Sequence, residues 1–147
     1  MPKPRETVLI VEDDILCAMV IRDELQDAGY RVLELTSRRD EALAAARANP
    51  PDIALVNIQL HGHDDGIALS ADLKLLGIPV LLISGQVNRA RSAQSVAIGS
   101  LPKPYSPADA VRAVDYLIGR LAGNQALEPP LGLEVFASID DGLDDAA

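Results

Sequence analysis

Hydrophobic and polar residues are arranged along the chain in two alternating kinds of segment. Short apolar runs, of the length of strands, alternate with longer segments in which apolar residues recur at helical spacing. This alternation is typical of βα units arranged around a parallel sheet. It predicts strands at 7–11, 31–35, 53–58, 80–83 and 99–101, and helices at 15–28, between 37 and 49, at 67–76, between 84 and 99, and at 106–121.

Residues with strong local preferences predict where the helices begin and end. Gly29 ends the first helix, and Ser37 with Asp40 has the spacing of a capping box at the start of the second. Ser106, followed by Pro107, is the expected N-cap of the last helix. The apolar stripe that the first helix is expected to bury consists of Leu16, Val20, Ile21 and Leu25.

The composition of the chain changes after residue 122. From Gly123 onward there are six acidic residues and neither lysine nor arginine. A length of 147 residues, 48% of them hydrophobic, allows one sizeable core. We therefore expect one domain over residues 1–122 and an acidic C-terminal tail over residues 123–147. Such tails are commonly disordered, but Phe136 would then be exposed, so docking on the domain's own surface or on a partner is the alternative.

The charge balance and the cysteine content bear on partners and location. The chain carries 22 Asp and Glu residues against 13 Lys and Arg, a net charge of −9, whereas binding DNA or RNA requires clustered positive charge. Cys17 is the only cysteine, so no internal disulfide can form and a reducing compartment fits. No segment has the pattern of a signal peptide or a membrane span. We expect a cytoplasmic protein that binds neither nucleic acid nor membrane.

Polar residues stand at the ends of four of the predicted strands. Glu12 and Asp13 follow the first strand, Asn57 and Ser84 close the third and fourth, and Lys103 follows the fifth. Because the carboxyl ends of parallel strands meet at one edge of a sheet, these side chains should form one site.

The residue types at this site suit phosphoryl transfer, except that a nucleophile is missing. Two adjacent carboxylates repel each other unless a cation lies between them, and oxygen ligands of this kind suit Mg²⁺. A lysine and a hydroxyl nearby could hold phosphoryl oxygens, since this reaction depends mainly on positioning and charge neutralisation. Asn57, however, has a neutral amide that cannot form an acyl phosphate.

Four motifs of the chain resemble those of response-regulator receiver domains of two-component signalling. The likeness extends over roughly residues 7–121. It implies a flavodoxin-like α/β fold, in which a doubly wound sheet of five parallel strands in the order 2-1-3-4-5 has helices on both faces. The motifs are Val-Leu-Ile-Val-Glu12-Asp13-Asp14, Pro51-Asp52-Ile-Ala-Leu-Val-Asn57-Ile-Gln-Leu, Pro79-Val-Leu-Leu-Ile-Ser84-Gly85 and Lys103-Pro104-Tyr105.

The resemblance implies a metal site and a phosphoacceptor position. Glu12 and Asp13 match the acidic pair that binds the metal, and Gln59 matches the residue whose backbone carbonyl is a further ligand. Asn57 stands where the family carries the phosphorylated aspartate and would also lie beside the metal. Because an amide in place of a carboxylate removes one negative ligand charge, any Mg²⁺ should bind weakly. No organic cofactor is expected.

The resemblance also implies a group that senses phosphate, and this group departs from the family pattern at one position. Ser84 matches the switch hydroxyl and Lys103 the lysine that contacts the phosphate. Ser100 stands where the family usually has a Tyr or Phe that reports phosphorylation. In the family the bond between this lysine and the following proline is often cis, so Lys103–Pro104 is a candidate.

These observations leave three hypotheses for the function. The favoured one is a single receiver domain, not an enzyme, that acts by protein–protein binding without phosphorylation at Asn57. Its partners would be a sensor histidine kinase or a downstream signalling protein, and a homodimer is compatible with it. The second is a conventional phosphoacceptor receiver with an engineered Asp-to-Asn change at position 57. The third is a flavodoxin-like flavin-binding protein, which three carboxylates after the first strand disfavour because they repel a phosphate.

Overall fold

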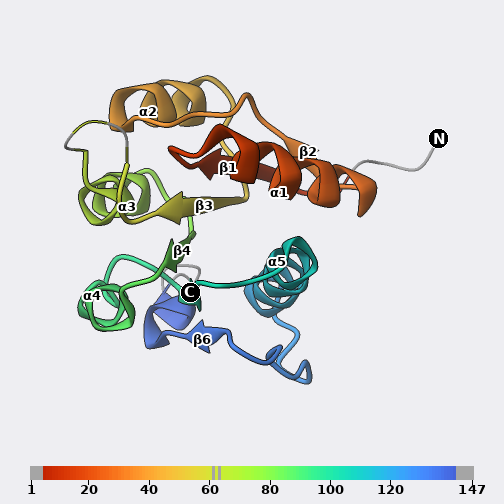
Figure 1. The fold of residues 1–147 in the computed structure, drawn as a ribbon. Helices are drawn as coiled ribbons and strands as arrows, with labels where there is room; N and C mark the ends of the chain where they lie inside the picture. Colours follow the sequence, from red (N-terminus) through yellow and green to blue (C-terminus); the bar gives the residue numbers. More distant parts are fainter. Residues whose placement is uncertain (1–4, 61, 63, 142–147) are drawn as a thin grey trace.

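A computed structural model describes residues 5–60, 62 and 64–141 of the chain, which form layers of helices around one sheet (Figure 1). The elements alternate between strand and helix from β1 to α5, as the hydrophobic pattern predicts. In chain order they are β1 (Thr7–Val11), α1 (Ile15–Asp27), β2 (Arg31–Val32), α2 (Arg39–Ala48), β3 (Ile53–Asn57), α3 (Gly66–Leu75), β4 (Val80–Ser84), α4 (Val87–Ser92), β5 (Gly99–Pro102), α5 (Pro107–Leu121), β6 (Glu134–Val135) and a 3₁₀ turn, η1 (Ala137–Asp140).

The sheet has the strand order β2-β1-β3-β4-β5-β6. The first five strands are parallel, which confirms the predicted order 2-1-3-4-5. The predicted number of five strands is wrong, because the segment after α5 adds β6 antiparallel to β5. In the parallel part, Asn57 pairs with Ile83 and Ser84 pairs with Pro102, so the carboxyl ends of neighbouring strands lie side by side.

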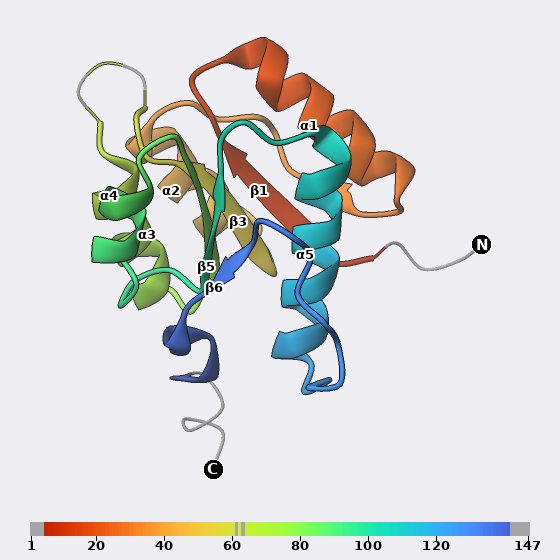
Figure 2. The ribbon, with the colours of Figure 1, turned by 60° about the horizontal axis from the view of Figure 1, so that its bottom comes forward.

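Helices cover both faces of the sheet, as expected. The two views place α1 and α5 on one face and α2, α3 and α4 on the other (Figures 1 and 2). The buried hydrophobic residues form two clusters, one on each face. β3 and β4 are buried along their whole length, which is typical of parallel strands enclosed on both sides.

The buried side of α1 differs from the predicted stripe. Ile21 and Leu25 are buried together with Ala18, whereas Leu16 is 70% and Val20 48% exposed. The residues at 18, 21 and 25 follow one another at helical spacing and contact the sheet, while 16 and 20 lie on a neighbouring stripe. The prediction was wrong for these two residues because an apolar residue does not reveal which stripe its helix buries.

The segment from β2 to α2 also differs from the prediction. β2 ends at Val32 instead of extending to residue 35, and Thr36 then forms an isolated parallel bridge with Val11. The predicted cap at Ser37 is wrong, since α2 begins at Arg39 and its N-cap residue is Arg38, whose side chain accepts no capping hydrogen bond. Instead, the Arg39 N–H donates to the carboxylate of Asp64 at 2.8 Å, so a distant loop satisfies this helix end.

The start of α5 agrees with the sequence. The Asp109 N–H donates to the Ser106 hydroxyl at 3.1 Å, and the Ser106 N–H donates to the Asp109 carboxylate at 2.9 Å, which completes a capping box. The bond between Lys103 and Pro104 is cis, as the resemblance implied.

Part of the acidic C-terminal segment packs on the domain. β6 pairs with β5, and the side chains of Phe136 and Ile139 are each only 4% exposed. Residues 142–147 of the predicted tail lie outside the described residues. None of the described helices is long and apolar enough to cross a membrane.

Gly66 fixes the distance between α3 and the end of β3. Its N–H donates to the Ile58 carbonyl at 2.7 Å, and a Cβ added at this position would overlap the backbone carbonyl of Asn57. We expect Gly66→Ala to lower the free energy of unfolding by about 1–3 kcal/mol, because the backbone must move apart. Urea unfolding measures this loss. Gly85→Ala is the matched control because a Cβ there meets open space, and equal losses in both variants would contradict the steric argument.

Candidate functional site

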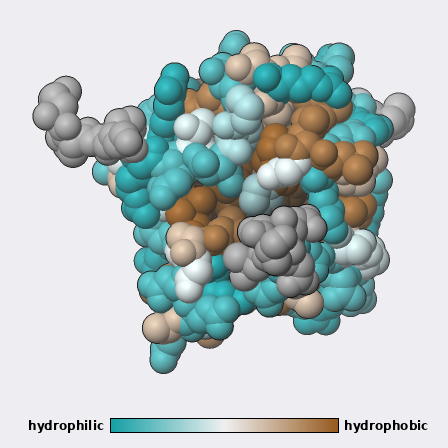
Figure 3. Space-filling model, turned by 180° about the vertical axis from the view of Figure 1, so that it is seen from behind, coloured by the Kyte–Doolittle hydropathy of each residue, from teal (hydrophilic) through white to brown (hydrophobic). Residues whose placement is uncertain are grey.

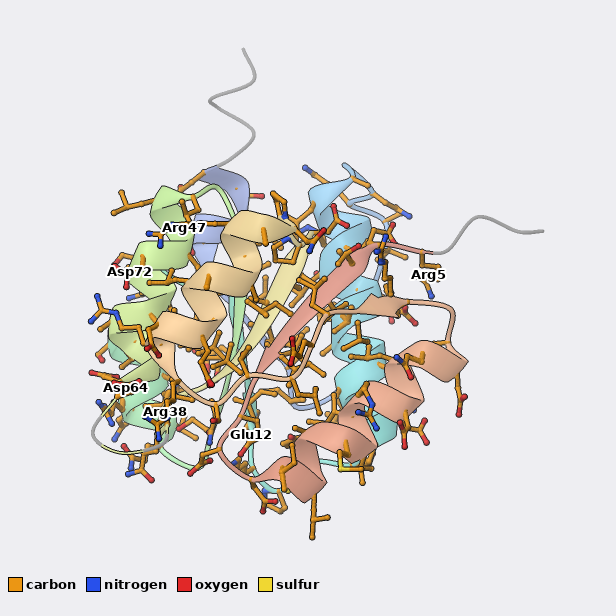
Figure 4. All side chains as sticks on the ribbon, turned by 90° about the horizontal axis from the view of Figure 1, so that it is seen from above. Arg5, Glu12, Arg38, Arg47, Asp64 and Asp72 are labelled. Atoms are coloured by element: carbon orange, nitrogen blue, oxygen red, sulfur yellow. The ribbon has the colours of Figure 1, made fainter. Side chains whose placement is uncertain are left out.

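A cleft of about 490 Å³ opens at the carboxyl ends of β1, β3, β4 and β5. The side-chain view places Glu12 at this end of the domain and Arg5 at the opposite end of β1 (Figure 4). The cleft therefore lies where parallel-strand geometry predicts it. The predicted site residues that line it are Glu12, Asp13, Asn57, Gln59, Ser84 and Lys103.

The side chain of Asn57 lies in the centre of a group of oxygen atoms. Its amide nitrogen Nδ2 is 3.2 Å from Glu12 Oε1, 3.2 Å from Asp13 Oδ1 and 2.9 Å from the backbone carbonyl of Gln59. All three neighbours accept hydrogen bonds, so the donating –NH₂ end of the amide must face them. The two amide hydrogens are therefore shared among three acceptors.

This arrangement has a direct consequence for metal binding. The three oxygens that the resemblance assigns to a metal ion all point at one atom, and that atom is Asn57 Nδ2. The amide nitrogen occupies the place where a cation would contact these oxygens. The oxygens suit Mg²⁺, but a cation could enter only if the amide turned or moved away. Within the described ranges, no three His, Cys, Asp or Glu side chains converge on a metal position.

Burial gives Glu12 the most strongly shifted carboxyl group of the cleft. The residue is 4% exposed, and this burial raises its pKa from 4.5 to about 7. A hydrogen bond from the Asp14 N–H at 3.1 Å and the charge of Lys103 lower the pKa, while the neighbouring Asp13 raises it. Ionising the buried Glu12 carboxyl group therefore costs free energy, and its hydrogen-bond donors reduce this cost.

Asp14 joins the cleft to α1. Its carboxylate accepts hydrogen bonds from the N–H groups of Leu16 at 3.0 Å and Cys17 at 3.2 Å, and it is the N-cap of the helix. These bonds, mainly the one from Cys17, hold the pKa of Asp14 below its usual value. The third acid of the motif is therefore a helix cap, whereas the first two contact Asn57.

Ser84 and Lys103 are held close together on the other side of the cleft. The Lys103 N–H donates to the Ser84 carbonyl at 3.0 Å. The Ser84 hydroxyl accepts from the Gln86 N–H at 2.8 Å, which orients the oxygen as the loop turns toward α4. Lys103 is exposed, and its ammonium group makes no ion pair within the described part of the chain.

Ser100 is the one predicted site residue that does not line the cleft. It is 5% exposed, lies inside β5, and is paired with Leu82 on one side and with Glu134 of β6 on the other. Sequence reasoning did not assign a role in the cleft to four further residues. These are Asp14, Cys17, Gly85 and Gln86, whose only signal was that they directly follow strands or begin the next helix.

The fold, the four motifs and the cleft define a class of protein. The chain belongs to the response-regulator receiver family, because residues 8–115 match the family model described as the response regulator receiver domain. It is therefore a receiver domain of two-component signalling. The match gives no support to the flavin-binding alternative.

Curated relatives agree with this assignment. The chain is 29% identical over 125 residues to the transcriptional regulatory protein BaeR of Escherichia coli O6:H1, an alignment that covers 82% of this chain and 51% of that protein. It is 30% identical over 126 residues to the transcriptional regulatory protein PdtaR of Mycobacterium tuberculosis, covering 82% of this chain and 60% of the relative. The chain thus spans only about half to three fifths of these relatives.

Solved structures give the same result. A response regulator described as putative from Chloroflexus aurantiacus has a TM-score of 0.71 and 29% identity, covering 80% of this chain and 100% of that one. The signal receiver domain of a modulated diguanylate cyclase from Desulfovibrio desulfuricans has a TM-score of 0.70 and 36% identity, covering 78% and 94%. A CheY-like receiver from Methanospirillum hungatei, at 24% identity and a TM-score of 0.70 over 78% of this chain and 94% of that one, shares the fold.

The raised pKa of Glu12 predicts a pH effect on stability. Between pH 4.5 and about 7 the folded chain holds a proton at Glu12 that the unfolded chain has lost. The stabilisation from this proton is complete below pH 4.5 and disappears as the pH rises through about 7.

We expect Glu12→Gln to gain stability relative to the wild type by about 1–2 kcal/mol between pH 5 and pH 8, after allowance for solvent screening. Glutamine keeps an oxygen acceptor for Asn57 but does not titrate. Thermal unfolding of both proteins across this pH range measures the difference. Parallel stability curves would show that Glu12 does not titrate in this range.

The hydrogen bonds of Asn57 predict how the domain responds to Mg²⁺. Asn57→Asp replaces a donor by a third carboxylate beside Glu12 and Asp13. Without metal we expect a loss of about 2 kcal/mol of stability, because the charged acceptors lose their donor and a like charge is added.

Millimolar Mg²⁺ should restore the stability of Asn57→Asp and change that of the wild type little. Melting curves with and without Mg²⁺ test both expectations. Sodium chloride at equal ionic strength is the control for the effect of added salt. An equal rise of the melting temperature in both proteins would contradict the view that the amide nitrogen takes the place of the cation.

Proposed function

We propose that this receiver domain transmits a signal by binding other proteins and is not phosphorylated at Asn57. The observation that carries this proposal is the position of Asn57 Nδ2 against Glu12, Asp13 and the Gln59 carbonyl. Through these contacts, the amide supplies hydrogen-bond donors to the two acids and the carbonyl. This arrangement supports a site that does not pass through a phosphorylated state at Asn57.

The chemistry of the residue supports the same proposal. The amide nitrogen of asparagine is neutral and has no free electron pair for attack on phosphorus, because that pair is delocalised into the carbonyl. A carboxylate at this position would form an acyl phosphate, whereas an amide would not. We therefore propose that the chain performs no phosphoryl transfer and is not an enzyme.

Mg²⁺ would at most be a weak ligand of this cleft. The carboxylates of Glu12 and Asp13 and the carbonyl of Gln59 would hold it, and its charge would neutralise the two acids. The ion must displace the Asn57 amide and compete with a proton on Glu12. Both costs lower its affinity.

An apolar surface beside the cleft supports binding to a protein partner. A groove of about 600 Å³ runs between α1 and the segment after β5, lined by Leu16 and Val20 on one side and by Tyr105 on the other. Lys103 and Cys17 line both this groove and the Asn57 cleft, so a partner bound in the groove would also contact residues of the cleft. Ile15 and Met19 extend the exposed apolar surface of α1.

The partner would be a sensor histidine kinase or a downstream signalling protein in the cytoplasm. Receiver domains interact with proteins of these kinds. The net charge of −9 supports a protein partner over DNA or RNA, and the exposed Cys17 suits a reducing compartment. In the space-filling view from behind, hydrophobic residues form separate areas between polar ones (Figure 3).

The proposal predicts the outcome of incubation with acetyl phosphate and Mg²⁺. Intact-protein mass spectrometry should show no phosphoryl group on the wild-type chain, because Asn57 cannot accept one. Asn57→Asp should acquire one phosphoryl group, since Lys103 and Ser84 are already in place.

Asn57→Asp combined with Lys103→Ala is the matched control and should be labelled more slowly, because the lysine charge would no longer stabilise the phosphoryl oxygens. A phosphoryl group on the wild-type protein would overturn the proposal. If wild type and Leu16→Glu bound a partner with equal affinity, the α1 groove would not be the surface that binds the partner.

A further inference from the structure

The C-terminal segment fills the edge of the sheet next to β5. Val135 pairs with Gly99 and Glu134 pairs with Ser100 in antiparallel register. The Phe136 N–H continues the ladder with a hydrogen bond of 2.9 Å to the Ile98 carbonyl. Figure 2 shows β6 beside β5, between α4 and α5. Without this segment, the backbone of β5 would present unpaired N–H and C=O groups.

Two buried side chains anchor the segment, one on each side of the sheet. Phe136 belongs to the hydrophobic cluster under α2, α3 and α4, whereas Ile139 belongs to the cluster under α1 and α5. Each is 4% exposed. The Ser138 hydroxyl between them donates to the backbone carbonyl of Ala97. The edge therefore binds the segment through two buried apolar side chains in addition to its backbone groups.

Basic residues surround this edge and face the acids of the segment. Arg91 of α4 contacts both carboxylate oxygens of Glu134 at 3.0 Å. Arg120 of α5 lies 3.4 Å from Asp140, and Lys74 of α3 lies 3.7 Å from Asp141. The carboxylate of each pair is exposed to solvent, so these ion pairs add little stability. They instead favour the binding of an acidic segment over a neutral or basic one.

Two glycines make room for the segment. A Cβ at Gly99 would lie 2.9 Å from the Glu134 carbonyl oxygen. A Cβ at Gly119 of α5 would overlap the side chain of Leu127, which belongs to the connection leading to β6. The surface of the domain is thus shaped for a chain that passes close to β5 and α5.

We propose that the β5 edge is a binding site for an acidic, extended segment of another protein, and that residues 133–141 are its competing occupant within the same chain. Strand addition uses backbone hydrogen bonds that any sequence can supply, while pockets and charges select the sequence. The segment that fits has an acid, a β-branched residue and an aromatic residue in succession, as in Glu134-Val135-Phe136.

The internal segment has an advantage that does not come from its contacts. It is tethered to α5, so its effective concentration at the edge is high, on the order of millimolar for a short flexible connection. Two ladder pairs, the hydrogen bonds from the Phe136 N–H and the Ser138 hydroxyl, two anchors and exposed ion pairs hold it in place. An outside segment with comparable contacts therefore binds when the internal one is weakened or displaced.

The test uses the whole chain of 147 residues and a fluorescein-labelled peptide with the sequence of residues 131–141. Fluorescence anisotropy compares the wild type with Phe136→Ala, which removes one anchor of the internal segment. We expect at least about tenfold tighter peptide binding by Phe136→Ala than by the wild type, because the edge is then free more often. Glu134→Lys should also tighten peptide binding, by a smaller factor. Because this change is at the surface, the variant should fold, and it tests the proposal even if Phe136→Ala folds poorly.

Glu128→Lys is the matched control, since it makes the same charge change in the connection before β6. Arg91→Glu added to Glu134→Lys should weaken peptide binding again by removing the cation that faces the acid.

Three results would overturn the proposal. One is equal binding of the peptide by wild type, Glu134→Lys and Glu128→Lys, and another is no binding by folded Glu134→Lys. The third is a wild-type dimer in light scattering that disappears in Glu134→Lys, which would make a second copy of this chain the occupant. The experiment involves neither Asn57 nor a metal ion, so its failure leaves the proposed function untouched.

Discussion

The buried carboxyl group of Glu12 is the constraint on which the end of the sheet depends. A carboxylate with little access to water is costly unless donors or positive charge surround it. Asn57 supplies an amide donor, Asp14 supplies a backbone N–H, and Lys103 supplies a charge. A cation could supply the same compensation to the two acids. In this chain the Asn57 amide, a permanent part of the protein, donates a hydrogen bond to Glu12. Asparagine at this position is therefore compatible with a folded receiver domain.

The general position of the site could be predicted from the sequence because it follows from strand direction alone. Once the strands are parallel, residues that follow them must meet at one edge, as Glu12, Ser84 and Lys103 do. The hydrogen bonds of Asn57 could not be predicted in this way. The sequence indicates that a nucleophile is missing, but only the side-chain arrangement reveals that the amide nitrogen faces all three oxygens.

The features that the sequence did not predict all depend on contacts between distant segments. Leu16 and Val20 have the right residue type for a core, yet the neighbouring stripe of α1 is the buried one. The N–H group at the start of α2 is bound by Asp64, 25 residues further on. Gly66 offered a signal, since a glycine at the start of a helix often marks a close approach of two backbones.

The sheet ends on each side in a strand of only two residues, β2 and β6. Short border strands present few free backbone groups on which another molecule could continue the ladder. The net negative charge adds a repulsion between copies that acts before any such contact forms. The protein should therefore stay dispersed at high concentration, because its sheets have little tendency to pair edge to edge into fibres.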